Sequence, residues 1–136
     1  ICVTGDGGFF MVCQEVITAV EWQVPVVWVV FNNLALTAIR QGQKAAYGGR
    51  IIGTEFTQRP DFAAMAHAFG AAGIRVSEYA EFRPAMEEAL HCGRPCVVDV
   101  ITPTDPVVPP VAGKWCEPGR DWPAPLPRGA LRQYSI

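Results

Sequence analysis

The chain has little charge and few of the residue types that build charged or metal-rich surfaces. Only 18% of its 136 residues are charged, two are histidine, and the net charge is -2. Since there is no run of basic residues, the composition favours neither nucleic-acid binding nor attraction to an anionic membrane. No apolar run reaches the length of a membrane span, and the first residues lack the basic start of a signal peptide. We therefore expect a cytoplasmic protein without a membrane segment.

Several common ligand-binding motifs are also missing. No G-x-G-x-x-G follows the first predicted strand and no acidic residue ends the second, which argues against an NAD-type Rossmann domain, and there is no P-loop. The five cysteines form no C-x-x-C pair and lack the spacing of a zinc site. We expect them to be buried thiols, and we expect His67 and His91, which lie in helical patterns, to be structural.

What the chain has in quantity is apolar material, 50% of its residues, which is enough for the core of one globular unit. Short β-branched runs predict strands over residues 1–4, 25–31, 72–76 and 96–101, the first of them buried. Helical spacing predicts helices over residues 10–22, 34–46, 60–69 and 77–90, and residues 47–57 predict an ordered loop. This alternation predicts an α/β fold with a parallel sheet in three layers.

Two polar turns follow the first two predicted strands: Gly5-Asp6-Gly7-Gly8 and Asn32-Asn33. A right-handed βαβ crossover makes these strands parallel, so both turns lie at the carboxyl edge of the sheet, where open α/β sheets bind ligands. Asp6 and Asn33 offer only hard oxygen ligands, which suit Mg²⁺ or Ca²⁺. Gly7 and Gly8 are expected to leave their main-chain amides free for phosphate oxygens. The pattern predicts a metal-bridged diphosphate site.

These two motifs, separated by residues 8 to 31, resemble the GDG and NN motif of thiamine diphosphate-dependent enzymes. The intervening residues are similar to the large catalytic subunit of acetolactate synthase and its relatives. The resemblance implies a partial thiamine diphosphate-binding domain over residues 1–112 and a Pro-rich tail over 113–136. It implies Mg²⁺ bound by Asp6, Asn33 and the carbonyl of Ala35. It implies the following cofactor-binding residues: Gly5, Asp6, Gly7, Gly8, Asn33 and Ala35.

Residues 37–43 resemble a segment that lines the substrate pocket of acetolactate synthases. There the family pattern has a methionine and a tryptophan, for which this chain has Ala38 and Gly42, while Arg40 and Gln41 agree with the pattern. The two small residues predict a wider pocket, and Arg40 or Lys44 is a candidate to pair with an anionic group of the substrate. The polar residues could equally be the solvated face of a helix.

The resemblance implies an enzyme that decarboxylates a 2-oxo acid and joins it to a 2-oxo acid or aldehyde acceptor. A sulfoacetaldehyde acetyltransferase-like enzyme, which Ala38 and residues 50–54 also resemble, and a simple 2-oxo acid decarboxylase are alternatives. From another class, the chain could be a non-catalytic cofactor-binding homologue or an inactive fragment.

The family also implies parts outside this chain. Ile1 opens within a predicted strand, so we expect a fragment of a longer protein, without turnover alone. The activating glutamate is expected in a separate pyrimidine domain, so no catalytic residue is assigned here. A homodimer or homotetramer is expected through the full-length protein. FAD is possible on the part outside this chain, although no residue here supports it.

Overall fold

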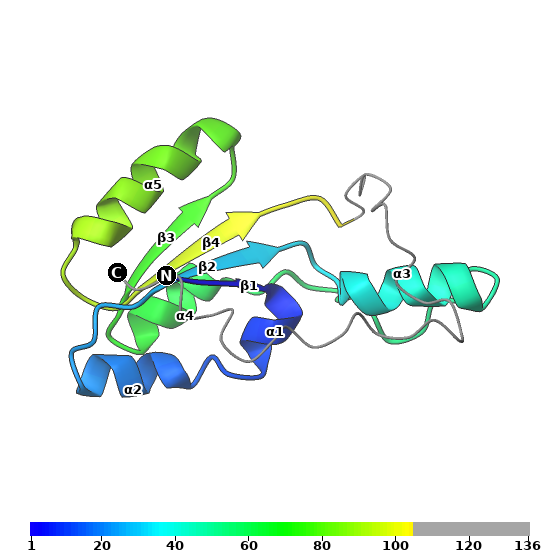
Figure 1. The fold of residues 1–136 in the computed structure, drawn as a ribbon, viewed down its shortest axis with the longest axis horizontal. Helices are drawn as coiled ribbons and strands as arrows, with labels where there is room; N and C mark the ends of the chain where they lie inside the picture. The colour runs from blue at the N-terminus through cyan, green and yellow to red at the C-terminus, as the bar shows by residue number, and fades with distance from the viewer. Residues whose placement is uncertain (105–136) are drawn as a thin grey trace, which may run out of the picture. The chain divides into compact units, whose positions relative to one another are not determined.

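A parallel four-stranded sheet forms the centre of the structure, a computed structural model that describes residues 1–104. The strands are β1 (Cys2–Gly5), β2 (Val27–Asn32), β3 (Ala72–Val76) and β4 (Cys96–Ile101), in the spatial order β1-β2-β4-β3 (Figure 1). All three neighbouring pairs are parallel. The sequence predicted the ends of β2 and β4, and both ends of β3, to within one residue.

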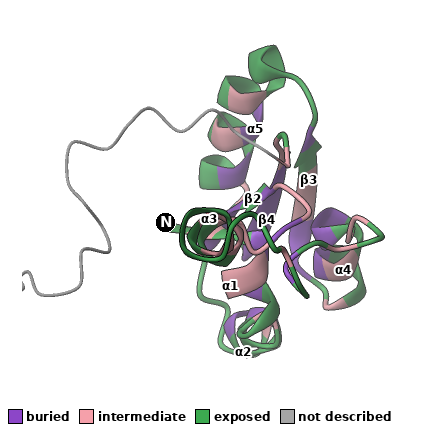
Figure 2. Ribbon diagram, turned by 90° about the vertical axis from the view of Figure 1, so that its right-hand side faces the viewer, coloured by how far each residue is buried: buried purple, intermediate pink, exposed green. Residues whose placement is uncertain are grey.

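Helices cover both faces of this sheet, which confirms the predicted three-layer α/β fold (Figure 2). On one face, Trp28, Val30 and Val97 pack with α1 (Asp6–Phe10), α2 (Glu15–Glu21) and α4 (Phe62–Ala68). On the other face, Val29 and Val98 pack against α5 (Tyr79–His91). Because successive strand residues point to opposite faces, β2 and β4 need apolar residues at nearly every position.

The expectation that the first strand is buried is wrong. Val3 keeps 64% of its surface exposed, because β1 lies at the edge and pairs only with β2 among the residues that the structure describes. The expectation of buried thiols fails in the same place, since Cys2 is exposed. Cys13 and Cys92 are partly exposed and Cys96 is buried. Cys116 lies outside the described residues.

The helix predicted over residues 10–22 is wrong in its first part, since only α2 (Glu15–Glu21) and the last residue of α1, Phe10, are helical in this range. The glycine turn is itself the first turn of α1, and residues 11–14 form turns before α2 begins. The break lets α1 and α2 each direct an apolar side chain into the same cluster, Phe9 from α1 and Val16 from α2, both fully buried. Val12 lies in these turns and is 46% exposed.

The helix expected from residue 34 begins later, as α3 (Thr37–Ala46). Leu34 has a positive φ of 66°, and the residues around it pair with the loop: Leu36 N donates to the oxygen of Thr54, and Phe56 N donates to the oxygen of Leu34. The positive φ of Leu34 is not a helical conformation, so the helix begins only after this turn. Figure 1 places α3 beyond the carboxyl end of β2.

The helix predicted from Pro60 and Asp61 is confirmed, because Asp61 Oδ1 accepts the amide of Ala64 at 2.8 Å and caps α4. On α5, Ala85 and Ala89 are buried against the sheet, whereas Leu90 is 51% exposed. No helix in residues 1–104 has the length and apolarity to cross a membrane. The boundary predicted at residue 112 and the tail over 113–136 lie outside the described residues.

Candidate functional site

The carboxylate of Asp6 joins the start of α1 to the turn that follows β2. It is only 2% exposed. Its Oδ2 accepts the main-chain amides of Asn33 at 3.1 Å and Leu34 at 2.8 Å, and its Oδ1 accepts the amide of Gly7 at 2.8 Å. The structure therefore brings Asp6 and Asn33 together at the carboxyl ends of β1 and β2, although the contact joins a carboxylate to main-chain amides.

The side chain of Asn33 is held by its own turn. Its Nδ2 donates to Thr37 Oγ1 at 2.7 Å, and its Oδ1 accepts the amide of Ala35 at 3.1 Å. The positive φ of Leu34 makes this sharp reversal possible, at a conformational cost of about 1–3 kcal/mol for a residue with a side chain. Two hydrogen bonds from the turn to one charged acceptor offset that cost.

Gly7 and Gly8 pack closely against their surroundings. A Cβ on Gly7 would collide with Cδ2 of Leu36, and one on Gly8 would lie 2.7 Å from Oγ1 of Thr4. The expectation that the Gly7 amide is free is wrong, because it donates to Asp6 Oδ1. The Asp6 side chain folds back over the first turn of α1 and takes that donor. Gly5 precedes this turn in extended conformation.

The predicted metal ligands suit a hard cation chemically. Asp6 Oδ1, Asn33 Oδ1 and the carbonyl oxygen of Ala35 each accept one main-chain amide, which leaves a lone pair on each oxygen. One carboxylate and two neutral oxygens leave positions for phosphate oxygens and water around Mg²⁺. Residues 1–104 contain no cluster of three or more His, Cys, Asp or Glu.

The residues proposed to line the substrate pocket lie on α3, which is held to the loop that follows it. Arg40 Nε donates to Glu55 Oε1 at 2.7 Å. Gln43 donates to the oxygen of Ile52 at 3.0 Å and accepts its amide at 3.1 Å. Arg40 therefore has an acidic partner within this chain, and α3 and the loop form one unit.

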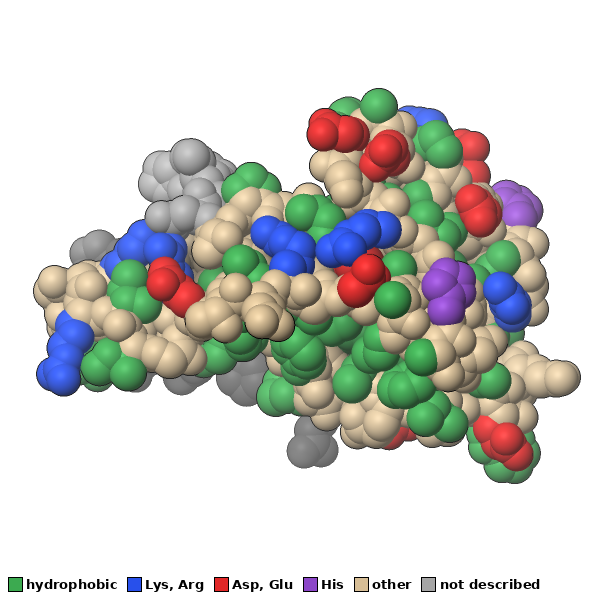
Figure 3. Space-filling view, turned by 180° about the vertical axis from the view of Figure 1, so that it is seen from behind, with side chains coloured by type: hydrophobic (Ala, Val, Ile, Leu, Met, Phe, Trp, Pro, Cys, Tyr) green, Lys and Arg blue, Asp and Glu red, His purple; other side chains and the backbone are tan. Residues whose placement is uncertain are grey.

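Ala38 and Gly42 are exposed on α3, and a Cβ on Gly42 would meet nothing within 4 Å. Gln41 is partly exposed. In the space-filling view, acidic and basic side chains are interspersed over the face shown (Figure 3). The chain therefore has room for a large side chain at position 42, as the acetolactate synthase pattern has.

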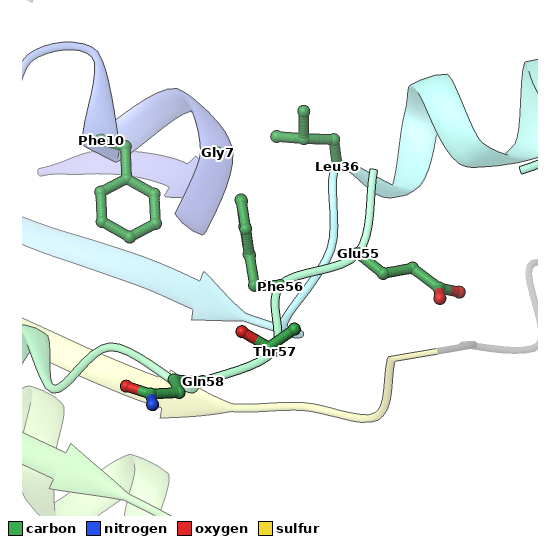
Figure 4. Close-up of a pocket in the computed structure, with 7 residues that line it drawn as sticks. All are labelled: Gly7, Phe10, Leu36, Glu55, Phe56, Thr57 and Gln58. Carbon is green, nitrogen blue, oxygen red and sulfur yellow. The ribbon is translucent and has the colours of Figure 1, made fainter. Parts of the chain in front are cut away.

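A hollow of about 650 Å³ lies beside the predicted metal ligands. Its lining residues are Gly7, Phe10, Leu36, Glu55, Phe56, Thr57 and Gln58 (Figure 4). The rings of Phe10 and Phe56 meet edge to face, with centroids 5.5 Å apart. Of the site residues predicted from the sequence only Gly7 lines this hollow. The aromatic walls were not predicted, because Phe56 lies in residues 47–57, which have no periodic pattern, and Phe10 lies in a range predicted only as helix.

Asn32 and Asp99 lie fully buried beneath the candidate site, and the sequence did not predict that they contact each other there. Asn32 Nδ2 donates to Asp99 Oδ1 at 2.9 Å and to the oxygen of Pro60 at 3.0 Å, and Asp99 Oδ2 accepts the amide of Phe62 at 3.3 Å. Burial raises the pKa of Asp99, while the hydrogen bond from Asn32 opposes the rise. A signal was present, because Asp99 is the one charged residue in the run from Cys96 to Ile101.

Comparison with known proteins gives consistent matches. Residues 1–100 match the family model of the thiamine pyrophosphate enzyme C-terminal TPP binding domain. The chain is 39% identical over 115 residues to a probable acetolactate synthase large subunit of Methanococcus aeolicus, covering 82% of this chain and 19% of that protein. It is 42% identical over 109 residues to a putative thiamine pyrophosphate-containing protein, YdaP, of Bacillus subtilis, and the match covers 80% of this chain and 19% of that protein.

A solved structure is similar as well. The thiamine diphosphate-dependent 4-hydroxybenzoylformate decarboxylase of Rhodococcus jostii RHA1 matches with a TM-score of 0.70 at 27% identity, covering 76% of this chain and 19% of that one. The chain thus spans about one fifth of the length of each of these relatives.

Proposed function

Since the chain belongs to the thiamine pyrophosphate enzyme family through its C-terminal binding domain, we propose that Asp6 and Asn33 hold the cofactor's diphosphate through Mg²⁺. The observation that carries this proposal is the contact between the Asp6 carboxylate and the turn bearing Asn33, at 2.8 and 3.1 Å. It brings the two motifs to one edge of the sheet, next to small glycines that let phosphate oxygens approach the main chain.

In this proposal each residue has a separate task. Asp6 supplies the anionic ligand, and Asn33 and the carbonyl of Ala35 supply neutral oxygens. Gly7 keeps the first turn of α1 clear of a side chain that would collide with Leu36. When bound, thiamine diphosphate supplies the carbanion stabilisation needed for carbon–carbon chemistry, and the protein supplies binding and orientation.

We propose that the whole protein is an acetolactate synthase-like enzyme that acts on 2-oxo acids. The names of several relatives support this reading. A simple 2-oxo acid decarboxylase is the second candidate, favoured by the likeness to a decarboxylase structure and by the open space at Gly42. Sulfoacetaldehyde acetyltransferase-like chemistry is the third. A cofactor-binding homologue without catalysis is the candidate from another class.

Calorimetry on the intact protein tests the cofactor site. We expect thiamine diphosphate to bind only when Mg²⁺ is present, and thiamine without its diphosphate to bind far more weakly. Asp6→Ala should abolish this binding. Asp61→Ala, which removes an exposed carboxylate that also accepts a main-chain amide at 2.8 Å, should retain it. Unchanged thiamine diphosphate affinity in Asp6→Ala would exclude the proposed site.

Product analysis with the intact protein separates the reactions. With pyruvate as substrate, an acetolactate synthase-like enzyme releases acetolactate, whereas a simple decarboxylase releases acetaldehyde. Acetyl phosphate formed from sulfoacetaldehyde and phosphate would identify the acetyltransferase. Cofactor binding without turnover of any 2-oxo acid or of sulfoacetaldehyde would leave the non-catalytic homologue.

A further inference from the structure

Burying Asp99 inside the sheet costs desolvation free energy. It lies between Val98 and Val100 with no exposed surface, and burial raises the pKa of its carboxyl group. A buried carboxylate must be desolvated, and a pair of apolar side chains of similar size can replace a buried polar pair at little cost to stability. Asp99 Oδ2 also accepts the amide of Phe62 at the start of α4 and lies 3.9 Å from Arg75 Nε, but neither contact requires the hydrogen bond that Asp99 Oδ1 accepts from Asn32.

The pair of Asn32 and Asp99 lies at the carboxyl end of β2, next to the candidate site. Asn32 is the last residue of β2, and its side chain is anchored in the core by Asp99. Asn33 follows directly, where its main-chain N–H donates to Asp6 Oδ2 at 3.1 Å and its side-chain oxygen accepts the amide of Ala35. The anchor at Asn32 therefore fixes the point from which the turn bearing Asn33 starts.

We propose that Asp99 is a positioning residue for the metal site: it holds Asn32 in the core and so keeps Asn33 aimed toward the cation. This inference rests on the proposed function. Arg59 assists, because its Nη1 donates to the main-chain oxygen of Asn32 and lies 3.4 Å from its side-chain oxygen. The amide of Thr102 reaches the same main-chain oxygen at 3.0 Å. The two asparagines of the motif thus have different tasks.

Asp99→Asn in the intact protein is the test. An asparagine has one acceptor oxygen, whereas Asp99 accepts from Asn32 through one oxygen and from Phe62 through the other, so one of these two donors loses its partner. Calorimetry would follow thiamine diphosphate binding over a series of magnesium concentrations. We expect the magnesium concentration for half-maximal binding to rise about tenfold or more, as for other residues that orient a metal ligand. Full binding stoichiometry should return at saturating magnesium.

Asp61→Asn is the matched control. Both carboxylates lie near Arg75, Asp61 Oδ2 at 2.9 Å from Nη1 and Asp99 Oδ2 at 3.9 Å from Nε, but Asp61 is exposed and its side chain bonds Ala64 and Arg75. Its magnesium requirement should stay within about twofold of the wild-type value, since exposed ion pairs contribute little.

The outcomes are distinct. A purely structural role for Asp99 would lower the fraction of protein that binds but leave the magnesium requirement of that fraction unchanged, and this result would overturn the inference. If Asp99→Asn does not fold, Arg59→Lys carries the test, because lysine keeps the charge but does not place a donor at the position of Nη1, the atom through which Arg59 contacts both Asn32 oxygens. An unchanged magnesium requirement there would also overturn it. Wild-type protein that binds no thiamine diphosphate would instead refute the proposed function.

Discussion

Asp6→Asn should weaken the turn after β2 even when no cofactor or metal is bound. The carboxylate accepts three main-chain amides, two at Oδ2 and one at Oδ1, and it is almost fully buried. Asparagine has only one acceptor oxygen. Its best orientation keeps the oxygen toward Asn33 and Leu34 and turns the amino group against the N–H of Gly7. One donor loses its partner, and the other two lose a charged acceptor.

The size of the effect follows from these bonds. A buried donor left without a partner costs about 1–3 kcal/mol, and Gly7 is only partly buried, so about 2 kcal/mol is a reasonable total. A loss of about 2 kcal/mol raises the population of the opened turn about 30-fold. Hydrogen exchange read by mass spectrometry reports this locally, in the peptide that carries Asn33 and Leu34. The exchange measurement is made on the intact protein without cofactor and with a chelator that removes metal ions.

The control is Asp61→Asn, because Asp61 also accepts a main-chain amide at 2.8 Å but is exposed. Asparagine caps a helix about as well as aspartate, so the exchange of α4 should change little and that of the turn not at all. Equal exchange of the turn in Asp6→Asn and wild type would refute the argument that Asp6 organises the site before any metal arrives.

Two further predictions concern stability. Gly73→Ala should destabilise the protein by about 1–3 kcal/mol by urea denaturation, because its Cβ would collide with the carbonyl oxygen of Ala63 and press α4 away from β3. The same change at Gly42, where nothing lies within 4 Å, should stabilise α3 by about 0.5–1 kcal/mol, and a loss at both positions would contradict the argument. The main-chain amide of Ser77, and after it that of Glu78, donates to the carboxylate of Glu81 and lowers its pKa. The ionised carboxylate therefore stabilises the fold above the ordinary glutamate pKa of about 4.3. This stabilisation is lost as the pH falls through the lowered pKa. The stability difference between wild type and Glu81→Gln should therefore shrink on acidification, and a difference that grows would be inconsistent with these hydrogen bonds from the start of α5.

Much of the fold could be predicted because its central strands are covered on both faces. Such strands are continuous apolar runs with polar residues at their carboxyl ends, which is why the ends of β2 and β4 and the meeting of Asp6 with Asn33 could be placed. The break between α1 and α2 could not be placed, because it depends on where Phe9 and Val16 find room in one cluster.

The sequence also could not predict that Asn32 bonds Asp99 in the core while Asn33 bonds Asp6 at the candidate site. Which of them faces the core depends on the pleat of β2, and the partner of Asn32 depends on β4 lying next to β2. Strand neighbours that are distant in the chain are a tertiary property, and no local pattern around Asn32 reports them. The late start of α3 has a similar cause, since the pairing of Leu36 with Thr54 overrides a helix-like composition.

The strand order β1-β2-β4-β3 also has a kinetic consequence. Each outer strand and its inner neighbour are close in sequence, whereas the inner strands meet only after a long connection. Asn32 and Asp99, which join them, are 67 positions apart. Loop-closure entropy opposes such distant contacts until the intervening segments have packed. We therefore expect β2 and β4, which the hydrogen bond between Asn32 and Asp99 joins, to pair last, so that the proposed metal site takes its final geometry only when folding is complete.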